Sequence, residues 1–96
     1  PRIQGSDAHA GHTETSLMLA INPQSVRLDK VDIGNVQPMS ELQHDLQTQG
    51  VKAVSENGIL GNASTATAEH GEEMLTALTN DLRSFIHTTY EQWTIA

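Results

Sequence analysis

The fold and chemistry of this chain are indicated by one stretch, Asp7-Ala8-His9-Ala10-Gly11-His12-Thr13-Glu14-Thr15-Ser16. Within eight positions it carries four side chains that can bind a metal or transfer a proton: Asp7, His9, His12 and Glu14. Imidazole and carboxylate donors together suit zinc, manganese or iron. Water bound to such a metal becomes a nucleophile near neutral pH. A nearby histidine can then pass a proton to the leaving amine.

The expected local structure brings two of these side chains together. In an extended loop Asp7 and His9 face the same side, because side chains alternate along extended backbone. Glu14, at the start of a helix, points its carboxylate back toward that loop, so His9 and Glu14 converge. The spacing alone is more typical of a polar loop whose histidines cap or hydrogen-bond locally. Catalytic zinc also usually takes three protein ligands.

The remaining histidines offer no third ligand. His44 and His70 lie on predicted helices with acidic neighbours, and we expect both to be solvated. His87 lies late in the last predicted helix, where a cation interacts favourably with the helix dipole, so a structural role is expected there.

A predicted helix over 14–21 follows the loop, with Thr13 or Thr15 as its cap and Pro23 as its stop. Residues 17–21 are consecutively apolar. A helix that is apolar all round is buried on every side. Such burial requires layers on more than one face, which 96 residues can hardly provide.

The middle of the chain is predicted to form short elements. A helical turn is expected over 23–28, with Val26 and Leu28 inward, and a connection over 29–36. A short amphipathic helix is expected over 40–49 because Leu42 and Leu46 stand four residues apart. The later elements are a helix stop at Gly50, a strand over 51–55 and a turn at Asn57-Gly58.

The last predicted helix, from about 66 to 90, is the clearest element. Its apolar residues are spaced by three and four and form one stripe: Met74, Leu75, Leu78, Leu82, Phe85, Ile86 and Tyr90. Three glutamates, Glu69, Glu72 and Glu73, lie near the positive end of the helix dipole. Gly71 costs roughly 1 kcal/mol relative to alanine inside a helix, and we expect it to permit close approach of another backbone.

Composition excludes several classes of protein. Five basic and twelve acidic residues give a net charge of −7, so the chain has no basic surface for nucleic acid or an anionic membrane. It has no apolar run long enough to span a bilayer and no signal-peptide pattern. Without cysteine, disulfides are excluded and a cytoplasmic location is the expectation.

The aromatic residues indicate an incomplete core. There are three, Phe85, Tyr90 and Trp93, and none precedes position 85. Aromatic side chains supply much of the buried area in small cores. We therefore expect other polypeptide to complete this one.

Two ordered motifs resemble the creatininase family. The residues from His9 to Leu19 resemble the family's H-A-G-x-x-E-T-S motif. The residues Gly50 to Gly61, followed by Ala66-Thr67-Ala68-Glu69-His70-Gly71, resemble its G-V-L-G-D-P…A-T-A-E-x-G block, with Asn62-Ala63-Ser64 departing from it. The version around His9 is most similar to family members of mycofactocin systems, which trim a modified precursor peptide.

The resemblance implies both fold and chemistry. It implies an α/β, three-layer, creatininase-like fold, with residues 1–96 as the C-terminal fragment of one domain and helices packed on a mostly missing sheet. His9 matches the active-site histidine, expected to assist proton transfer and hold the substrate. Glu14 matches the motif glutamate, expected to act in catalysis as a ligand of the divalent metal (zinc, manganese or iron) or beside it. His12 occupies a variable position of the motif.

The resemblance also implies partners. Most metal ligands of the family come from upstream motifs that this sequence lacks, so the N-terminal part of the enzyme is an expected partner, and ring-like homo-oligomers are expected. The substrate would be a peptide or a small amide. Ala8 and Gly5 stand where creatinine-hydrolysing members have acidic and aromatic residues, which disfavours creatinine. The alternatives are a non-catalytic assembly module, a cyclic-amide hydrolase, or a small acidic interaction domain.

Overall fold

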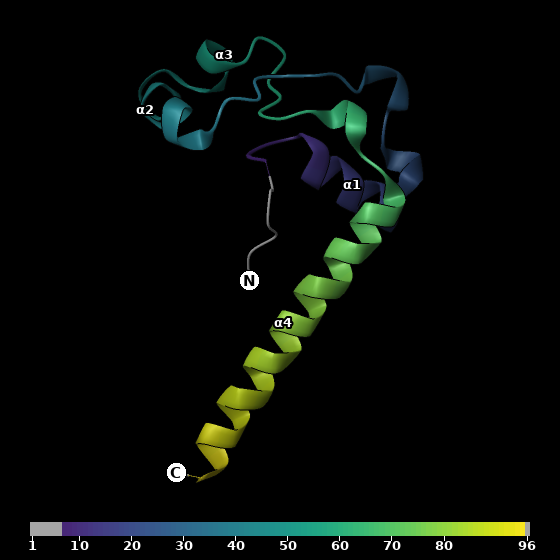
Figure 1. Cartoon of the computed structure of the whole chain (residues 1–96), viewed down its shortest axis with the longest axis vertical. Helices are drawn as coiled ribbons and strands as arrows, with labels where there is room; N and C mark the ends of the chain where they lie inside the picture. The colour runs from purple at the N-terminus through teal and green to yellow at the C-terminus, as the bar shows by residue number, and fades with distance from the viewer. Residues whose placement is uncertain (1–6, 96) are drawn as a thin grey trace.

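The computed structural model describes residues 7–95, and the side chains of residues 7–93. Four α-helices run in the order α1 (His12–Ile21), α2 (Met39–Gln49), α3 (Val51–Val54) and α4 (Ala68–Ile95). Three short 3₁₀ turns lie between them: Pro23–Ser25, Leu28–Lys30 and Ala63–Thr65. In Figure 1, α1 lies beside the first turns of α4, α2 and α3 lie together at the other end, and the rest of α4 projects away.

Within residues 7–95 no strand forms, so the α/β prediction is only partly visible. Antiparallel bridges join His9 to Leu60 and Ile33 to Asn62. The amides of Ala8 and His9 donate to the Leu60 carbonyl at 3.1 and 3.2 Å, and the Leu60 amide donates back to His9 at 2.8 Å. Residues 59–63 therefore lie between two extended segments, 8–9 and 32–35, as a central strand would.

The strand predicted over 51–55 is wrong. Val51–Val54 forms the single turn α3, closed by a 2.9 Å hydrogen bond from the Ser55 amide to the Val51 carbonyl. Four residues of weak alternation fit one helical turn as well as a short strand. The glycine stop is confirmed, since Gly50 ends α2 with a φ of +89°. The turn at Asn57-Gly58 is confirmed as well, with Gly58 at a φ of +82°.

The packing of α1 on α4 is the main tertiary contact. A Cβ added at Gly71 would lie 1.9 Å from the Ser16 carbonyl oxygen and 3.0 Å from the Ala20 Cβ. The close backbone approach expected at Gly71 is thus confirmed. The fully buried Ser16 side chain accepts a 3.1 Å hydrogen bond from the Thr67 amide, just before α4 begins.

The start of α1 differs from the prediction. The helix begins two residues earlier than expected, with Gly11 as its N-cap, so Thr13 and Thr15 lie inside the helix. Thr67 caps α4 by accepting the His70 amide at 3.1 Å. The last helix also continues to Ile95, beyond the expected end near Tyr90.

The core is small because α1 is covered mainly on its α4 side. Buried apolar side chains are Leu19, Leu42, Leu60, Ala63 and Met74. The prediction that residues 17–21 are buried on all sides is wrong for this chain, because Met18 and Ile21 are 41% and 61% exposed. Leu28, expected inward, is 63% exposed, because its short 3₁₀ turn contains no buried residue.

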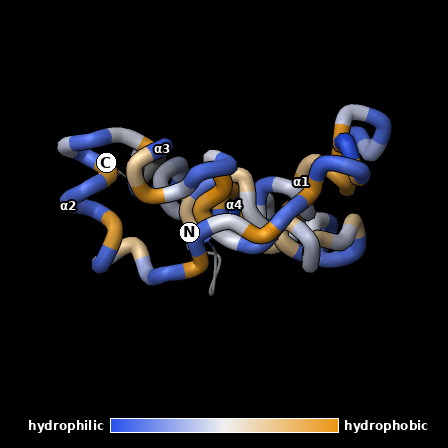
Figure 2. Tube along the Cα trace, turned by 90° about the horizontal axis from the view of Figure 1, so that it is seen from above, coloured by the Kyte–Doolittle hydropathy of each residue, from blue (hydrophilic) through white to orange (hydrophobic). Residues whose placement is uncertain are grey.

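The apolar stripe of α4 is buried only near its start. Beyond Leu78 it is exposed, at Leu82, Phe85, Ile86, Tyr90 and Trp93. Apolar residues recur along the chain in Figure 2 without collecting in one centre. No helix among the described residues is long and apolar enough to cross a membrane.

Candidate functional site

The loop before α1 is shaped around the carboxylate of Asp7. That carboxylate accepts hydrogen bonds from the backbone amides of His12, at 2.5 Å, and Thr13, at 3.1 Å. It thereby satisfies amides at the start of α1 that have no partner within the helix. A Cβ at Gly11 or Gly61 would fall 2.0 or 2.1 Å from Asp7 Oδ2, so both glycines leave room for this carboxylate.

The same hydrogen bonds affect the ionisation of Asp7. Partial burial acts to raise its pKa, but hydrogen bonds from the Thr13 and His12 amides outweigh burial and hold the pKa below its usual value. Asp7 is therefore a stable anion at the positive end of α1. The sequence singled out Asp7 for metal or proton chemistry, whereas its oxygens are engaged in capping. The spacing of an Asp five residues before a helix start gave no indication of this.

His9 and Glu14 converge, as the sequence predicts. His9 Nδ1 lies 3.8 Å from Glu14 Oε2, and the two side chains are 55% and 59% exposed. Glu14 Oε2 also accepts the Ala10 amide at 2.7 Å, which ties the α1 carboxylate to the loop. Between them Ala10 has a φ of +54°, a left-handed conformation that turns the chain from His9 into the helix. A carboxylate facing Nδ1 favours the tautomer whose Nε2 is free to accept a proton.

The other histidines are placed as follows. His44 is exposed on α2, as expected. His87 is exposed on α4 and lies 3.1 Å from Glu91. His70 is not simply solvated: it is half-buried, and its Nδ1 lies 2.5 Å from Nε2 of His12. Sequence reasoning missed this pair because its members are 58 residues apart and belong to separate motifs.

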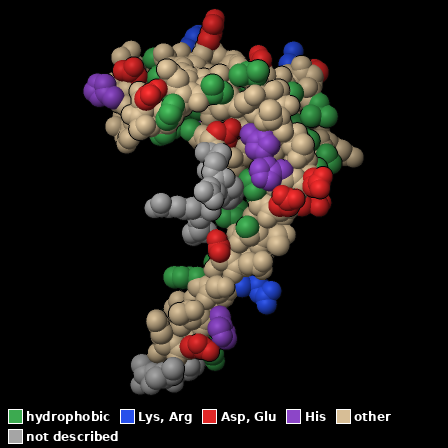
Figure 3. All heavy atoms as spheres, viewed as in Figure 1, with side chains coloured by type: hydrophobic (Ala, Val, Ile, Leu, Met, Phe, Trp, Pro, Cys, Tyr) green, Lys and Arg blue, Asp and Glu red, His purple; other side chains and the backbone are tan. Residues whose placement is uncertain are grey.

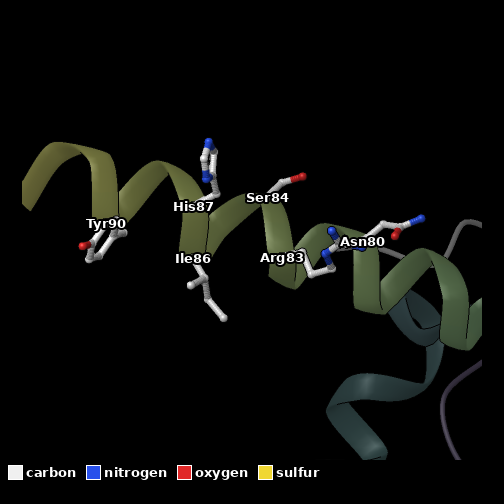
Figure 4. Close-up of a pocket in the computed structure, with 6 residues that line it drawn as sticks. All are labelled: Asn80, Arg83, Ser84, Ile86, His87 and Tyr90. Carbon is white, nitrogen blue, oxygen red and sulfur yellow. The ribbon is translucent and has the colours of Figure 1, made fainter.

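A hollow of about 480 Å³ lies beside the loop. It is lined by Asp7, Ala8 and His12, by residues 35–39, and by residues 60–62. A larger hollow, about 720 Å³, lies along α4, where every described lining residue belongs to that one helix. Figure 4 shows those side chains spread along its surface, without a second element facing them. We take the hollow beside the loop as the candidate substrate groove because three residues of the motif, Asp7, Ala8 and His12, line it.

The described residues include donors for part of a metal site. Among residues 7–95, no group of three or more His, Cys, Asp or Glu side chains is arranged to hold a metal ion. His9 and Glu14 supply two suitable donors near one another, and Glu14 Oε2 is already held in place by a backbone amide. Two donors fall short of the three protein ligands usual in catalytic zinc sites.

Comparison with known proteins identifies the family. The creatininase family model, described as creatinine amidohydrolase, matches residues 1–86. The chain belongs to the creatininase family. The resemblance indicated by the two motifs is thereby confirmed.

Individual creatininase-family relatives extend the match. A mycofactocin precursor peptide peptidase of Mycolicibacterium smegmatis is 47% identical over 78 residues, covering 81% of this chain and 32% of the relative. The protein of that name from Mycobacterium ulcerans is 46% identical over 82 residues, covering 85% of this chain and 33% of the relative. The chain thus spans about a third of the length of these relatives.

A solved structure supports the fold assignment. A candidate creatinine amidohydrolase from Bacteroides fragilis NCTC 9343 superposes with a TM-score of 0.66 at 28% identity. The match covers 82% of this chain and 33% of that one. The helices described above therefore belong to a creatininase-like fold, of which the described residues show mainly the helical part.

Proposed function

We propose that this chain is the C-terminal part of a metal-dependent amidohydrolase that hydrolyses a C–N amide bond in a peptide. The observation that carries the proposal is the convergence of His9 and Glu14 on a loop whose motif is that of the family. The similarity to mycofactocin precursor peptide peptidases favours a modified precursor peptide as substrate.

His9 acts in proton transfer and in holding the substrate. Its Nδ1 faces Glu14, so Nε2 is the nitrogen that accepts a proton and later delivers it to the leaving amine. The 3.8 Å separation is longer than a hydrogen bond, and we expect it to shorten when substrate orders the loop. Both side chains are more than half exposed, which leaves the imidazole accessible to a bound peptide.

Glu14 is a ligand of the divalent metal, or lies directly beside it, and positions the loop through Ala10. Zinc, manganese or iron suits its carboxylate, and the other ligands come from outside the described residues. When bound, such an ion lowers the pKa of water and polarises the scissile carbonyl. The groove beside the loop holds the peptide, and the complete enzyme is a homo-oligomer.

The leading alternative is a non-catalytic or assembly role for this segment. The absence of a three-ligand metal cluster among residues 7–95 favours it, and so does the exposed apolar side of α1 at Met18 and Ile21. A cyclic-amide hydrolase of the creatininase type is a second alternative, favoured by the Bacteroides fragilis structure.

The test compares variants in the complete protein that carries this chain. His9→Gln should lower kcat for peptide hydrolysis by about 10²–10⁴-fold, the usual contribution of one general acid–base group, with bound metal unchanged. His44→Gln, on exposed α2, is the matched control and should retain full turnover. Full activity of His9→Gln would contradict its role, and turnover of creatinine in place of peptide would favour the cyclic-amide alternative.

A further inference from the structure

His12 and His70 bring two ring nitrogens together at the start of two helices. His12 Nε2 lies 2.5 Å from His70 Nδ1, with the ring centroids 4.7 Å apart and the rings tilted by 46°. His12 is the first residue of α1, where its amide is held by Asp7, and His70 is in the first turn of α4. Figure 3 shows histidine side chains in contact on this face, next to acidic side chains.

The hydrogen bonds around the pair determine where its protons lie. The Thr65 hydroxyl donates its single proton to the Asn62 carbonyl at 3.1 Å. When it does so, its oxygen accepts the 2.8 Å hydrogen bond from His12, whose Nδ1 then carries the proton. In neutral His12 the Nε2 lone pair then points at His70 Nδ1. Two lone pairs repel at this distance, so either His70 Nδ1 carries its proton and donates it to His12 Nε2, or a metal ion lies between the two nitrogens.

We propose that His12 and His70 form a two-histidine site for a borderline divalent metal ion such as Zn²⁺, which takes the place of the proton on His70 Nδ1. Imidazole nitrogen is a preferred ligand of zinc, copper and nickel. Zn–N bonds of about 2.0–2.1 Å in tetrahedral geometry separate the two nitrogens by about 3.3 Å, so the rings must move apart by less than about 1 Å. Two N–metal bonds form while the His70 proton transfers from Nδ1 to Nε2 through solvent, and water fills the remaining positions.

Two further features support a cation at this place. Metal-binding histidines usually donate their second ring N–H to a fixed oxygen, and His12 donates to Thr65, which is itself fixed by Asn62. Three acidic residues in the first turns of α4 offset the positive end of the helix dipole, which by itself disfavours a cation: Glu69, Glu72 and Glu73. With two protein ligands, the site is a weak cross-link between α1 and α4, weaker than a closed four-ligand structural site.

The test is a Zn²⁺ titration of the full chain by isothermal calorimetry, after removal of metal with a chelator. Wild type should bind Zn²⁺, and His70→Gln should bind it at least about tenfold more weakly. His87→Gln is the matched control, because it removes an exposed histidine from the same helix, and it should bind as wild type does. Zn²⁺ should also raise the Tm of wild type and of His87→Gln, but not that of His70→Gln, because only a bound folded state is stabilised.

Two further variants keep the result interpretable. His9→Gln tests the His9–Glu14 pair separately, and loss of binding in His9→Gln with retention in His70→Gln would overturn the proposal. His12→Gln should weaken binding as His70→Gln does, and circular dichroism of both checks folding. Wild-type affinity in His70→Gln, or no Zn²⁺ binding by wild type up to millimolar concentration, would also overturn it.

Discussion

Gly71 of α4 lies against the backbone of Ser16 in α1, so closely that a Cβ at position 71 would fall 1.9 Å from the Ser16 carbonyl oxygen. The atom in the way is backbone, which cannot rotate aside as a side chain can. The spacing of the two helices therefore depends on a hydrogen at this position. This contact also brings the start of α4 beside α1, which carries Glu14.

Gly71→Ala should destabilise the fold by about 1–3 kcal/mol, the usual cost of overpacking a closely packed site. Helix propensity alone predicts the opposite, a gain of roughly 1 kcal/mol, so the sign of the change separates the two effects. Urea unfolding followed by circular dichroism measures it. Ser84→Ala, on an exposed part of the same helix, serves as control and should change stability little. A more stable Gly71→Ala protein would show that the helices separate easily.

Ser16→Ala should cost about 1–3 kcal/mol, because it leaves a partly buried amide without its acceptor. Ser16 is fully buried, and its hydroxyl accepts the Thr67 amide at 3.1 Å. Hydrogen exchange gives a local readout, since the Thr67 amide should exchange faster in the variant while amides of α2 stay unchanged. Equal Thr67 protection in both proteins would mean that another acceptor replaces the hydroxyl.

The helices could be predicted from sequence because their periodicity is local. The range 40–49 and the long final helix follow from apolar residues three and four apart, and Gly50 ends α2 as expected. The strand over 51–55 could not be decided locally, since a strand requires a neighbour to pair with and this segment has none among the described residues. The predicted burial of α1 was wrong for the same reason, because burial depends on which other segments cover the helix.

The candidate site also contains features that local sequence predicts and features that depend on tertiary packing. His9 and Glu14 are five residues apart, so a loop followed by a helix start was enough to predict that they converge. The His12–His70 pair depends on the packing of α1 on α4, which no local pattern specifies. The capping role of Asp7 depends on the left-handed turn at Ala10 and on the space left by Gly61, two features visible only in three dimensions.

Asp7→Ala should cost about 1 kcal/mol at neutral pH, as loss of a helix cap does. Because the folded state lowers the pKa of Asp7, the stabilisation is present above the ordinary value of about 3.9 and is lost as pH falls through the lower folded value. The stability difference between wild type and Asp7→Ala, measured by urea unfolding, should therefore shrink between pH 5 and pH 2.

Asp7→Asn is the control for this pH dependence, because the amide oxygen can still accept one of the two hydrogen bonds while carrying no charge. Its stability should lie between those of wild type and Asp7→Ala at pH 7 and should approach that of wild type in acid. A difference between wild type and Asp7→Asn that stays constant down to pH 2 would show that the charge of Asp7 contributes nothing.

Glu14 combines two roles that a pair of substitutions can separate. Its Oε2 accepts the Ala10 amide at 2.7 Å and lies 3.8 Å from His9 Nδ1. Glu14→Gln keeps an acceptor oxygen for Ala10 but removes the charge that a metal requires, whereas Glu14→Ala removes both. We expect Glu14→Gln to lie within about 0.5 kcal/mol of wild type in urea unfolding, and Glu14→Ala to lose about 1 kcal/mol.

The metal content of the complete protein then decides the role in catalysis. If Glu14 is a ligand, both variants should lose bound metal and turnover together, even though only Glu14→Ala loses stability. If Glu14→Gln keeps its metal and its activity while Glu14→Ala loses activity, the glutamate acts by holding the His9 loop through the Ala10 amide, and the metal has all of its ligands elsewhere.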